Sequence, residues 1–272
     1  AGLTGGAVVR DLARRGHDVI GVVRRGEQRG RLGGMETAVA DCADPEAMAA
    51  LLAGCDGLVH VAGIALGSAL ASVRGLRRLS TVVVVSSAGI YSAHQPSAAL
   101  YREGEEALRA ARPDLVLVRP TMIYGSERDR NVHHVIRFAR RYGFLPIVGR
   151  GAGRLQPIHY ADLAAAIGAL VDAEVGEPLD AGGAAPITTR DAARAIFAAL
   201  GRPARLVAVP AAPAWLLARA VDALRGTRWA ERVRRAKEDR SVDNARLVQL
   251  TGVRPRDFET GVRDQVRESG GR

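Results

Sequence analysis

The sequence predicts an α/β fold, a doubly wound parallel sheet followed by a smaller and mostly helical C-terminal region. Two observations support this prediction. Short, continuously apolar segments alternate with helical segments over the first half of the chain, which is typical of parallel strands covered on both faces. A glycine-containing stretch at the start of the chain also opens a helix that precedes a strand, an arrangement suited to the pyrophosphate of a dinucleotide.

The opening stretch contains Gly2 and Gly5, and the amphipathic helix behind it runs as far as Gly16. Glycine has no Cβ atom to keep a phosphate from the backbone, and a helix N-terminus offers free N–H groups. The dinucleotide fingerprint places a strand and a first glycine before such a pair. A parallel sheet without its central strand would leave a groove in the core. We therefore expect that further residues precede Ala1; the alternative is a glycine-rich turn without a ligand.

The following segments alternate regularly. Strands are expected at 18–23, 36–40, 57–61, 81–85 and 114–118, and helices at 45–53, 68–79 and 98–111. Asp44 fits the N-cap and Pro45 the first turn of the helix at 45–53. In parallel sheets, ligands bind beyond the carboxyl ends of the strands. The residues at these ends are Gly2, Gly5, Arg24, Arg25, Asp41, Ala62, Gly63, Ser86, Ser87 and Pro120, and their convergence predicts a binding site.

The pattern loosens from about residue 124. Helices are expected at 131–141, 161–171, 188–200, 214–224 and 229–237, with a short strand at 205–209. We divide the chain into a dinucleotide-binding core, residues 1–125, and a substrate-binding region, residues 126–272. Residues 156–185 of the second region are expected to return to the core.

Composition narrows the class of protein. Apolar residues form 47% of the chain, yet no apolar run reaches the length of a membrane-spanning helix. The two cysteines, Cys42 and Cys55, have no metal-ligand spacing, so we expect a reduced cytoplasmic protein without a metal. The formal charge of +10 favours an anionic partner. Basic residues are interleaved with acids and aromatic residues are only 4%, so we expect a small-molecule substrate and no nucleic acid. Because no apolar run could span a bilayer, we also expect no membrane partner. The sequence leaves open whether the protein forms a homodimer.

Six pieces of sequence occur in the order found in one family. They are GLTG at 2–5, Asp41 after the third strand, VSSAGIY at 85–91, RPTMIYG at 119–125, PIHYADLA at 157–164 and SVDNAR at 241–246. Over nearly the full length, the chain resembles the extended short-chain dehydrogenase/reductases, the NAD(P)-dependent epimerase/dehydratase family. The resemblance implies a Rossmann-type fold. It also implies an NAD(P)-dependent oxidoreductase or epimerase-type enzyme acting on a carbonyl/alcohol centre, in a nucleotide-linked sugar or a secondary metabolite.

The resemblance also assigns catalytic roles, with Ser87 binding the substrate oxygen and Tyr101 acting as general acid/base. In the family, a lysine four residues after the tyrosine lowers the pKa of its phenol. Glu105 stands at that position here, and the only lysine of the chain is Lys237, so the chain looks like an atypical member. A carboxylate favours the protonated phenol. The alternatives are a strand-end hydroxyl for Ser87 and a packing role for Tyr101.

Binding residues follow from the same resemblance. The cofactor is assigned to Gly2, Leu3, Thr4, Gly5, Arg24, Arg25, Asp41, Cys42, Ala62, Gly63, Pro120 and Met122, and the substrate to Ser87, Tyr124 and Arg137. Arginines accommodate a ribose 2′-phosphate, whereas an acidic residue binds the 2′-hydroxyl. Because no acidic residue lies between Asp18 and Glu27, we expect NADP rather than NAD. The alternative is a solvated basic loop.

A basic helix follows residue 125. Arg130, His134, Arg137 and Arg141 share one face at helical spacing, which predicts an anionic substrate group; a solvated surface helix is the alternative. Two further functions stay open. One is a redox-silent NADP-binding sensor or scaffold, and the other is non-redox chemistry in the same pocket.

Overall fold

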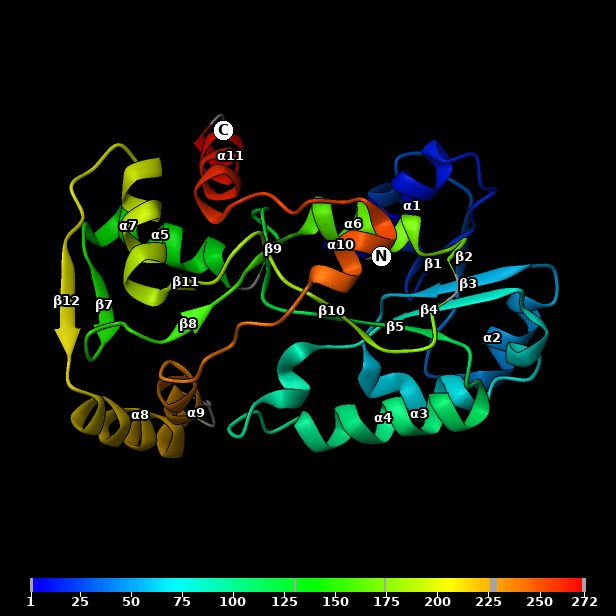
Figure 1. The fold of residues 1–272 in the computed structure, drawn as a ribbon, viewed down its shortest axis with the longest axis horizontal. Helices are drawn as coiled ribbons and strands as arrows, with labels where there is room; N and C mark the ends of the chain where they lie inside the picture. The colour runs from blue at the N-terminus through cyan, green and yellow to red at the C-terminus, as the bar shows by residue number, and fades with distance from the viewer. Residues whose placement is uncertain (1, 130, 174, 226–228, 271–272) are drawn as a thin grey trace.

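The computed structural model describes residues 2–129, 131–173, 175–225 and 229–270, and it shows an α/β architecture (Figure 1). The main sheet is parallel and has the strand order β10-β5-β4-β3. Its strands are β3 (Gly57–His60), β4 (Thr81–Val85), β5 (Val116–Pro120) and β10 (Leu179–Ala181). A separate parallel pair joins β1 (Gly21–Val23) to β2 (Thr37–Val39). The predicted fold class, a Rossmann-type doubly wound parallel sheet, is confirmed.

Both faces of the main sheet are covered, because alternate residues of each strand point to opposite faces. Val83 and Val85 pack in the same core as α1 (Leu3–Arg14) and α6 (Tyr160–Ala169). Val82 and Val84 pack in a second core, together with residues of α2 (Pro45–Leu52), α3 (Gly67–Ala71) and α4 (Ala98–Ala111). Each of these four valines is at most 5% exposed. The continuous apolar run of β4 is therefore the result of two-sided burial.

Local signals set several helix boundaries as predicted. The Asp44 carboxylate accepts from the N–H groups of Glu46 and Ala47 at 3.0 and 3.2 Å, and Pro45 begins α2. The helix predicted at 68–79 is shorter: α3 ends at Ala71, and the 3-10 turn η3 (Leu76–Arg78) follows. Gly75 lies between α3 and η3 with φ of +91°, a left-handed conformation that is unfavourable for other residues, so a continuous helix cannot pass through it.

The C-terminal region has its own core, around Ile136, Phe197 and Val262. The helices α5 (Val132–Tyr142), α7 (Thr189–Ala199) and α11 (Phe258–Gly270) contribute to it. Three short strand pairs lie in or beside this region. They are β6 (Ile123–Tyr124) with β9 (Ile158–His159), β7 (Leu145–Val148) with β12 (Leu206–Val209), and β8 (Arg154–Leu155) with β11 (Ile187–Thr188). The region predicted as mostly helical thus contains more strand than expected.

Two other parts of the C-terminal region pack in different places. The helices α8 (Ala211–Arg225) and α9 (Trp229–Arg235) pack against each other at the edge of the molecule (Figure 1). The segment 156–185 instead lies against the N-terminal half, since α6 packs on α1 and β10 pairs with β5. The short helix α10 (Ala245–Thr251) packs beside β10 and α6. Of the helices described, none combines the length and apolar character that crossing a bilayer requires.

Candidate active site at the strand ends

The N-terminus of α1 carries no side-chain cap among the described residues. Gly2 precedes the helix in an extended conformation. The first-turn N–H groups of an α-helix have no partner within the helix. A Cβ atom at Gly2 would meet none of the described residues within 4 Å. Gly5, Leu3 and Thr4 form the first turn itself.

The ends of β1 and β2 carry the predicted charged residues. Arg24 and Arg25 follow β1 and are exposed. The guanidinium of Arg25 lies 3.7 Å from the carboxylate of Glu27, a solvent-exposed pair of small energetic value. Asp41 follows β2, and its carboxylate accepts from the N–H of Ala43 at 3.0 Å. Its neighbour Cys42 is half-buried, and burial together with the charge of Asp41 raises the pKa of the thiol.

Beyond β3, the chain turns sharply at the predicted Ala62 and Gly63. Gly63 has φ of +109°, and a Cβ atom placed on it would meet nothing within 4 Å. Its carbonyl lies 3.3 Å from Nε2 of His60. Burial lowers the pKa of His60, so this ring is neutral at pH 7. The turn leaves an open backbone at the end of the strand, as a ligand-binding loop requires.

Ser87 and Tyr101 approach the same residue, Gly89. The Oγ atom of Ser87 accepts from the N–H of Gly89 at 3.0 Å. The ring of Tyr101 lies 3.3 Å from the position that a Cβ atom on Gly89 would occupy. The structure therefore brings this predicted pair together, although no hydrogen bond joins them in the part of the chain that is described. Tyr101 is partly buried against the core on its face of the sheet.

A connected polar group lies beside this pair, and we call it the strand-end network: Ser86, Tyr91, Glu105, Arg119 and Asp180. Glu105 is 4% exposed and accepts from Oγ of Ser86 at 2.5 Å and from Nε of Arg119 at 2.9 Å. A second nitrogen of the same guanidinium also donates to Glu105. The carboxylate of Glu105 is thus occupied by an ion pair with Arg119.

The network ends at an accessible phenol. Nη1 of Arg119 donates to the hydroxyl of Tyr91 at 2.7 Å, and that hydroxyl donates to Asp180 at 3.0 Å. Burial and the charge of Asp180 raise the pKa of Tyr91, while burial raises the pKa of Asp180. Tyr91 therefore stays a proton donor at neutral pH. Its side chain is 57% exposed.

Sequence reasoning missed this network, although one signal was present. Glu105 lies one turn from Tyr101 and three residues before Leu108, on the buried face of α4. A carboxylate in an apolar stripe needs a cation or several donors. Arg119 provides it from the end of β5, which lies next to β4 in the sheet.

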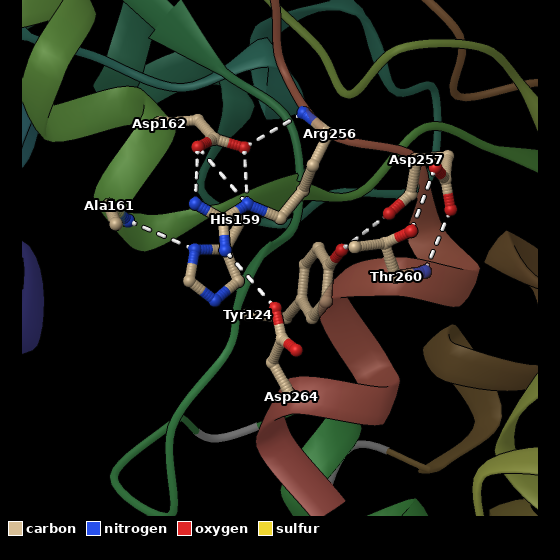
Figure 2. Close-up of polar contacts among 8 residues, drawn as sticks. All are labelled: Tyr124, His159, Ala161, Asp162, Arg256, Asp257, Thr260 and Asp264. Atoms are coloured by element: carbon tan, nitrogen blue, oxygen red, sulfur yellow. Dashed lines mark hydrogen bonds and ion pairs between the residues drawn. The ribbon is translucent and has the colours of Figure 1, made fainter.

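A second polar group lies around the buried side chains of Tyr124 and His159, and we call it the buried clamp: Tyr124, His159, Asp162, Arg256 and Asp264 (Figure 2). Arg256 donates to Asp162 through its side chain at 2.8 Å and through its backbone N–H at 2.9 Å. It also lies 3.4 Å from Asp264. These contacts tie the segment before α11 to the start of α6.

The aromatic half of the clamp is fully packed. Tyr124 is 0% exposed, with its ring centroid 5.0 Å from that of Phe258 and 5.4 Å from that of His159. Burial and the charge of Arg256 lower the pKa of His159 to about 4. The hydroxyl of Tyr124 has a long hydrogen bond, 3.5 Å, to the carbonyl of Asp257. The predicted contact of Tyr124 with substrate has no support in this geometry, because α11 covers the phenol.

The remaining predicted residues are dispersed. Pro120 is buried at the end of β5, and Met122 packs against the C-terminal core. Arg137, His134 and Arg141 are exposed on α5, while Arg130 lies outside the described residues. The described ranges hold no cluster of three or more His, Cys, Asp or Glu side chains suited to a metal ion.

Comparison with known proteins agrees with this geometry. The sequence profile of a family described as NAD(P)H-binding matches residues 1–137. The chain is 35% identical over 109 residues to the mitochondrial NADH dehydrogenase (ubiquinone) 1 alpha subcomplex subunit 9 of Arabidopsis thaliana, covering 39% of this chain and 27% of that protein. It is 30% identical over 180 residues to ceramide reductase of Caulobacter vibrioides, covering 60% and 56%. The matches thus span between about a quarter and just over half of these curated relatives.

Solved structures show the same fold over the whole chain. UDP-glucose 4-epimerase of Thermus thermophilus, in complex with NAD, has a TM-score of 0.75 at 19% identity, covering 100% of this chain and 97% of that one. The NADPH-dependent quinone oxidoreductase QOR2 of Escherichia coli, complexed with NADPH, has a TM-score of 0.76 at 17% identity, covering 95% of each chain.

Proposed function

Since the chain belongs to the NAD(P)H-binding family, we propose that it is an NAD(P)H-dependent oxidoreductase or epimerase-type enzyme acting on a carbonyl/alcohol centre of a small molecule. One observation carries this proposal. The open turn at Gly63 and the Ser87–Tyr101 pair follow neighbouring parallel strands, β3 and β4. That edge is where open α/β sheets bind ligands.

The cofactor-binding residues present fit a dinucleotide. The N-terminus of α1, which no side chain caps among the described residues, suits a pyrophosphate. Gly63 leaves room for a ligand against its backbone. Bound NAD(P)H supplies a hydride to a carbonyl carbon, or accepts one from an alcohol carbon as NAD(P)+. Because Arg24 is exposed at the end of β1, we propose that a 2′-phosphate contacts it and that NADP is preferred.

Titration of NADPH and NADH against the full chain tests the cofactor assignment. We expect tighter binding of NADPH, and we expect Arg24→Ala to narrow the difference by about 10- to 100-fold, the loss of a charged hydrogen bond worth about 1.5–3 kcal/mol. Arg194→Ala removes an equally exposed arginine elsewhere and serves as the matched control. Identical curves for the two cofactors in the unsubstituted protein would reject the preference for NADP.

We propose that Ser87 binds the substrate oxygen and Tyr101 donates the proton. The Ser87 hydroxyl accepts one hydrogen bond from Gly89 and still has its own hydrogen to donate. The carboxylate of Glu105 is held by Arg119, and Arg102 donates to the carbonyl of Ile90 at 2.9 Å. Because Arg119 and Arg102 are bound to these other groups, we propose that neither arginine takes the role of the family's lysine. Proton donation to a developing alkoxide then favours reduction over oxidation.

Tyr91 is a second candidate for the proton donor. Arg119 donates directly to its hydroxyl, which also donates to Asp180, so a cation and a proton acceptor meet at one phenol. Separate Tyr101→Phe and Tyr91→Phe variants distinguish the two. Loss of the donor should lower kcat by about 100-fold or more, with the fold checked by circular dichroism. Full activity in both variants would exclude both tyrosines.

The ion pair at the lysine position also favours a second function, a redox-silent NADP-binding sensor or scaffold. Chemistry without net redox in the same pocket is a related alternative. Equilibrium binding of NADPH combined with a turnover assay over a panel of aldehydes, ketones and quinones separates these functions. Binding with no turnover on any substrate would favour the redox-silent function over the enzyme.

We propose that residues 126–272 form the substrate-binding region and that the exposed basic face of α5 attracts an anionic substrate group. Arg137→Glu should raise KM for such a substrate by about tenfold at low salt, with little change in kcat. Arg263→Glu, at an exposed position of α11, makes the same charge change elsewhere. An unchanged KM in the Arg137 variant would remove α5 from the binding site.

A further inference from the structure

The outward face of α8 is apolar. Leu216, Leu217 and Leu224 are 62%, 68% and 86% exposed, whereas Ala218 on the opposite face is 8% exposed. At 3.6 residues per turn, the three leucines and Ala220 fall on one side of the helix. We call them the leucine face. An amphipathic helix of a water-exposed surface has its apolar side inward and its polar side outward. In α8 the inward residues Ala218 and Val221 are apolar, and the outward side is apolar as well.

The helix pair that carries this face is also rich in cations. Two guanidinium groups lie over the ring of Trp215, that of Arg219 at 5.2 Å and that of Arg234 at 4.9 Å from its centroid. Arg219 and Arg234 are both exposed. Residues 211–240 carry eight arginines and lysines against four acidic residues. The helix pair α8–α9 therefore combines exposed leucines and a tryptophan with an excess of positive charge.

We infer that the leucine face of α8 docks on the surface of an anionic lipid bilayer. Helices that lie in a membrane interface bury an apolar face among the acyl chains while basic residues contact anionic headgroups. Tryptophan is enriched at the same depth. The expectation of no membrane partner came from the lack of an apolar run long enough to span a bilayer. Interfacial docking does not need such a run.

Charge favours a bilayer over a second copy of this chain as the occupant. A symmetric dimer through the leucine face would bring two basic α8–α9 helix pairs together, in a chain whose formal charge is already +10. Like charges at such an interface oppose association. An anionic bilayer would instead neutralise the same arginines.

Flotation of the full chain with phosphatidylcholine vesicles, with and without phosphatidylglycerol, tests this inference. We expect binding to the anionic vesicles and weaker binding at high salt. The double variant Leu216→Glu/Leu217→Glu should bind about 100-fold more weakly, because the free energy gained by moving two leucine side chains out of water is lost. Leu100→Glu on α4, where the leucine is 44% exposed, is the matched control and should bind like the unsubstituted chain.

Intrinsic fluorescence gives a second measurement, because both tryptophans of the chain, Trp215 and Trp229, belong to this helix pair. Vesicle binding should shift their emission to the blue. No binding to anionic vesicles would overturn the inference, as would equal loss in the Leu100→Glu control. A dimer in analytical ultracentrifugation that the double variant abolishes, without vesicle binding, would assign the face to a second copy.

Discussion

Two regions of this protein use the same groups, an arginine paired with a carboxylate beside a tyrosine, with different results. In the strand-end network, Arg119 binds Glu105 and donates to Tyr91, whose side chain is 57% exposed. In the buried clamp, Arg256 binds Asp162 next to Tyr124, whose side chain is 0% exposed. The first arrangement presents a phenol to solvent, and the second encloses one.

The difference shows that packing, more than residue type, decides which group is available for chemistry. Arg119 and Tyr124 come from the same short segment, RPTMIYG. The arginine stays at the carboxyl edge of the main sheet, while the tyrosine enters the C-terminal core beneath α11. One segment thus supplies a residue to a candidate active site and another to the contact that holds the C-terminal helix.

The largest expected effect concerns the buried carboxylate of the strand-end network. Glu105→Lys places a second cation against Arg119 at a position only 4% exposed, so the free energy of unfolding should fall by about 3–5 kcal/mol. Glu105→Gln keeps the shape and should cost about 1–3 kcal/mol. Urea denaturation measures both values. Equal stability of the two variants would contradict an internal ion pair.

Removing the arginine of the buried clamp should lower the free energy of unfolding nearly as much as Glu105→Lys. Arg256→Ala leaves the Asp162 carboxylate, 12% exposed, without its cation, and we expect a loss of about 3 kcal/mol in the free energy of unfolding. Arg246→Ala removes an arginine from an exposed pair with Glu177, 3.5 Å apart, and should cost under about 0.5 kcal/mol. If both variants unfold at the same urea concentration, the clamp does not stabilise the fold.

Acid should weaken the clamp through His159. The pKa of His159 is about 4 in the folded protein, whereas the ordinary histidine value of 6.5 applies to the unfolded chain. As the pH falls, the unfolded chain therefore takes up a proton before the folded protein does. Stability should therefore decline between about pH 6.5 and 4, by at most about 3 kcal/mol. His60, whose pKa burial also lowers, acts in the same direction. His159→Gln should flatten the slope of unfolding free energy against pH; an unchanged slope would exclude His159 as its source.

The smallest effects separate the two tyrosines. Tyr124→Phe removes a hydroxyl whose hydrogen bond is 3.5 Å long, and Tyr91→Phe removes one at an exposed position. Each should change the free energy of unfolding by less than about 1 kcal/mol. Only Tyr91→Phe alters a residue that is exposed to solvent, so we expect only this variant to affect turnover without a change in melting temperature. A loss of activity in Tyr124→Phe at unchanged stability would reverse this assignment.

Local sequence patterns alone predicted much of the secondary structure of the N-terminal half. Apolar runs such as 81–85 specify strands buried on two faces, and Asp44 with Pro45 marks the start of a helix. These signals are local, because periodicity and capping depend on residues a few positions apart. The resemblance to a known family added the order of the site residues, of which Ser87 and Tyr101 do meet at Gly89.

Tertiary structure decided the rest. Two-residue strands such as β6 and β9 are too short to show a period, and the helices α10 and α11 were not predicted. The ion pairs of Glu105 with Arg119 and of Asp162 with Arg256 join residues 14 and 94 positions apart. No local pattern specifies such partners, because they depend on which strands and helices become neighbours. The exposure of Tyr91, the burial of Tyr124 and the outward face of α8 follow from that arrangement.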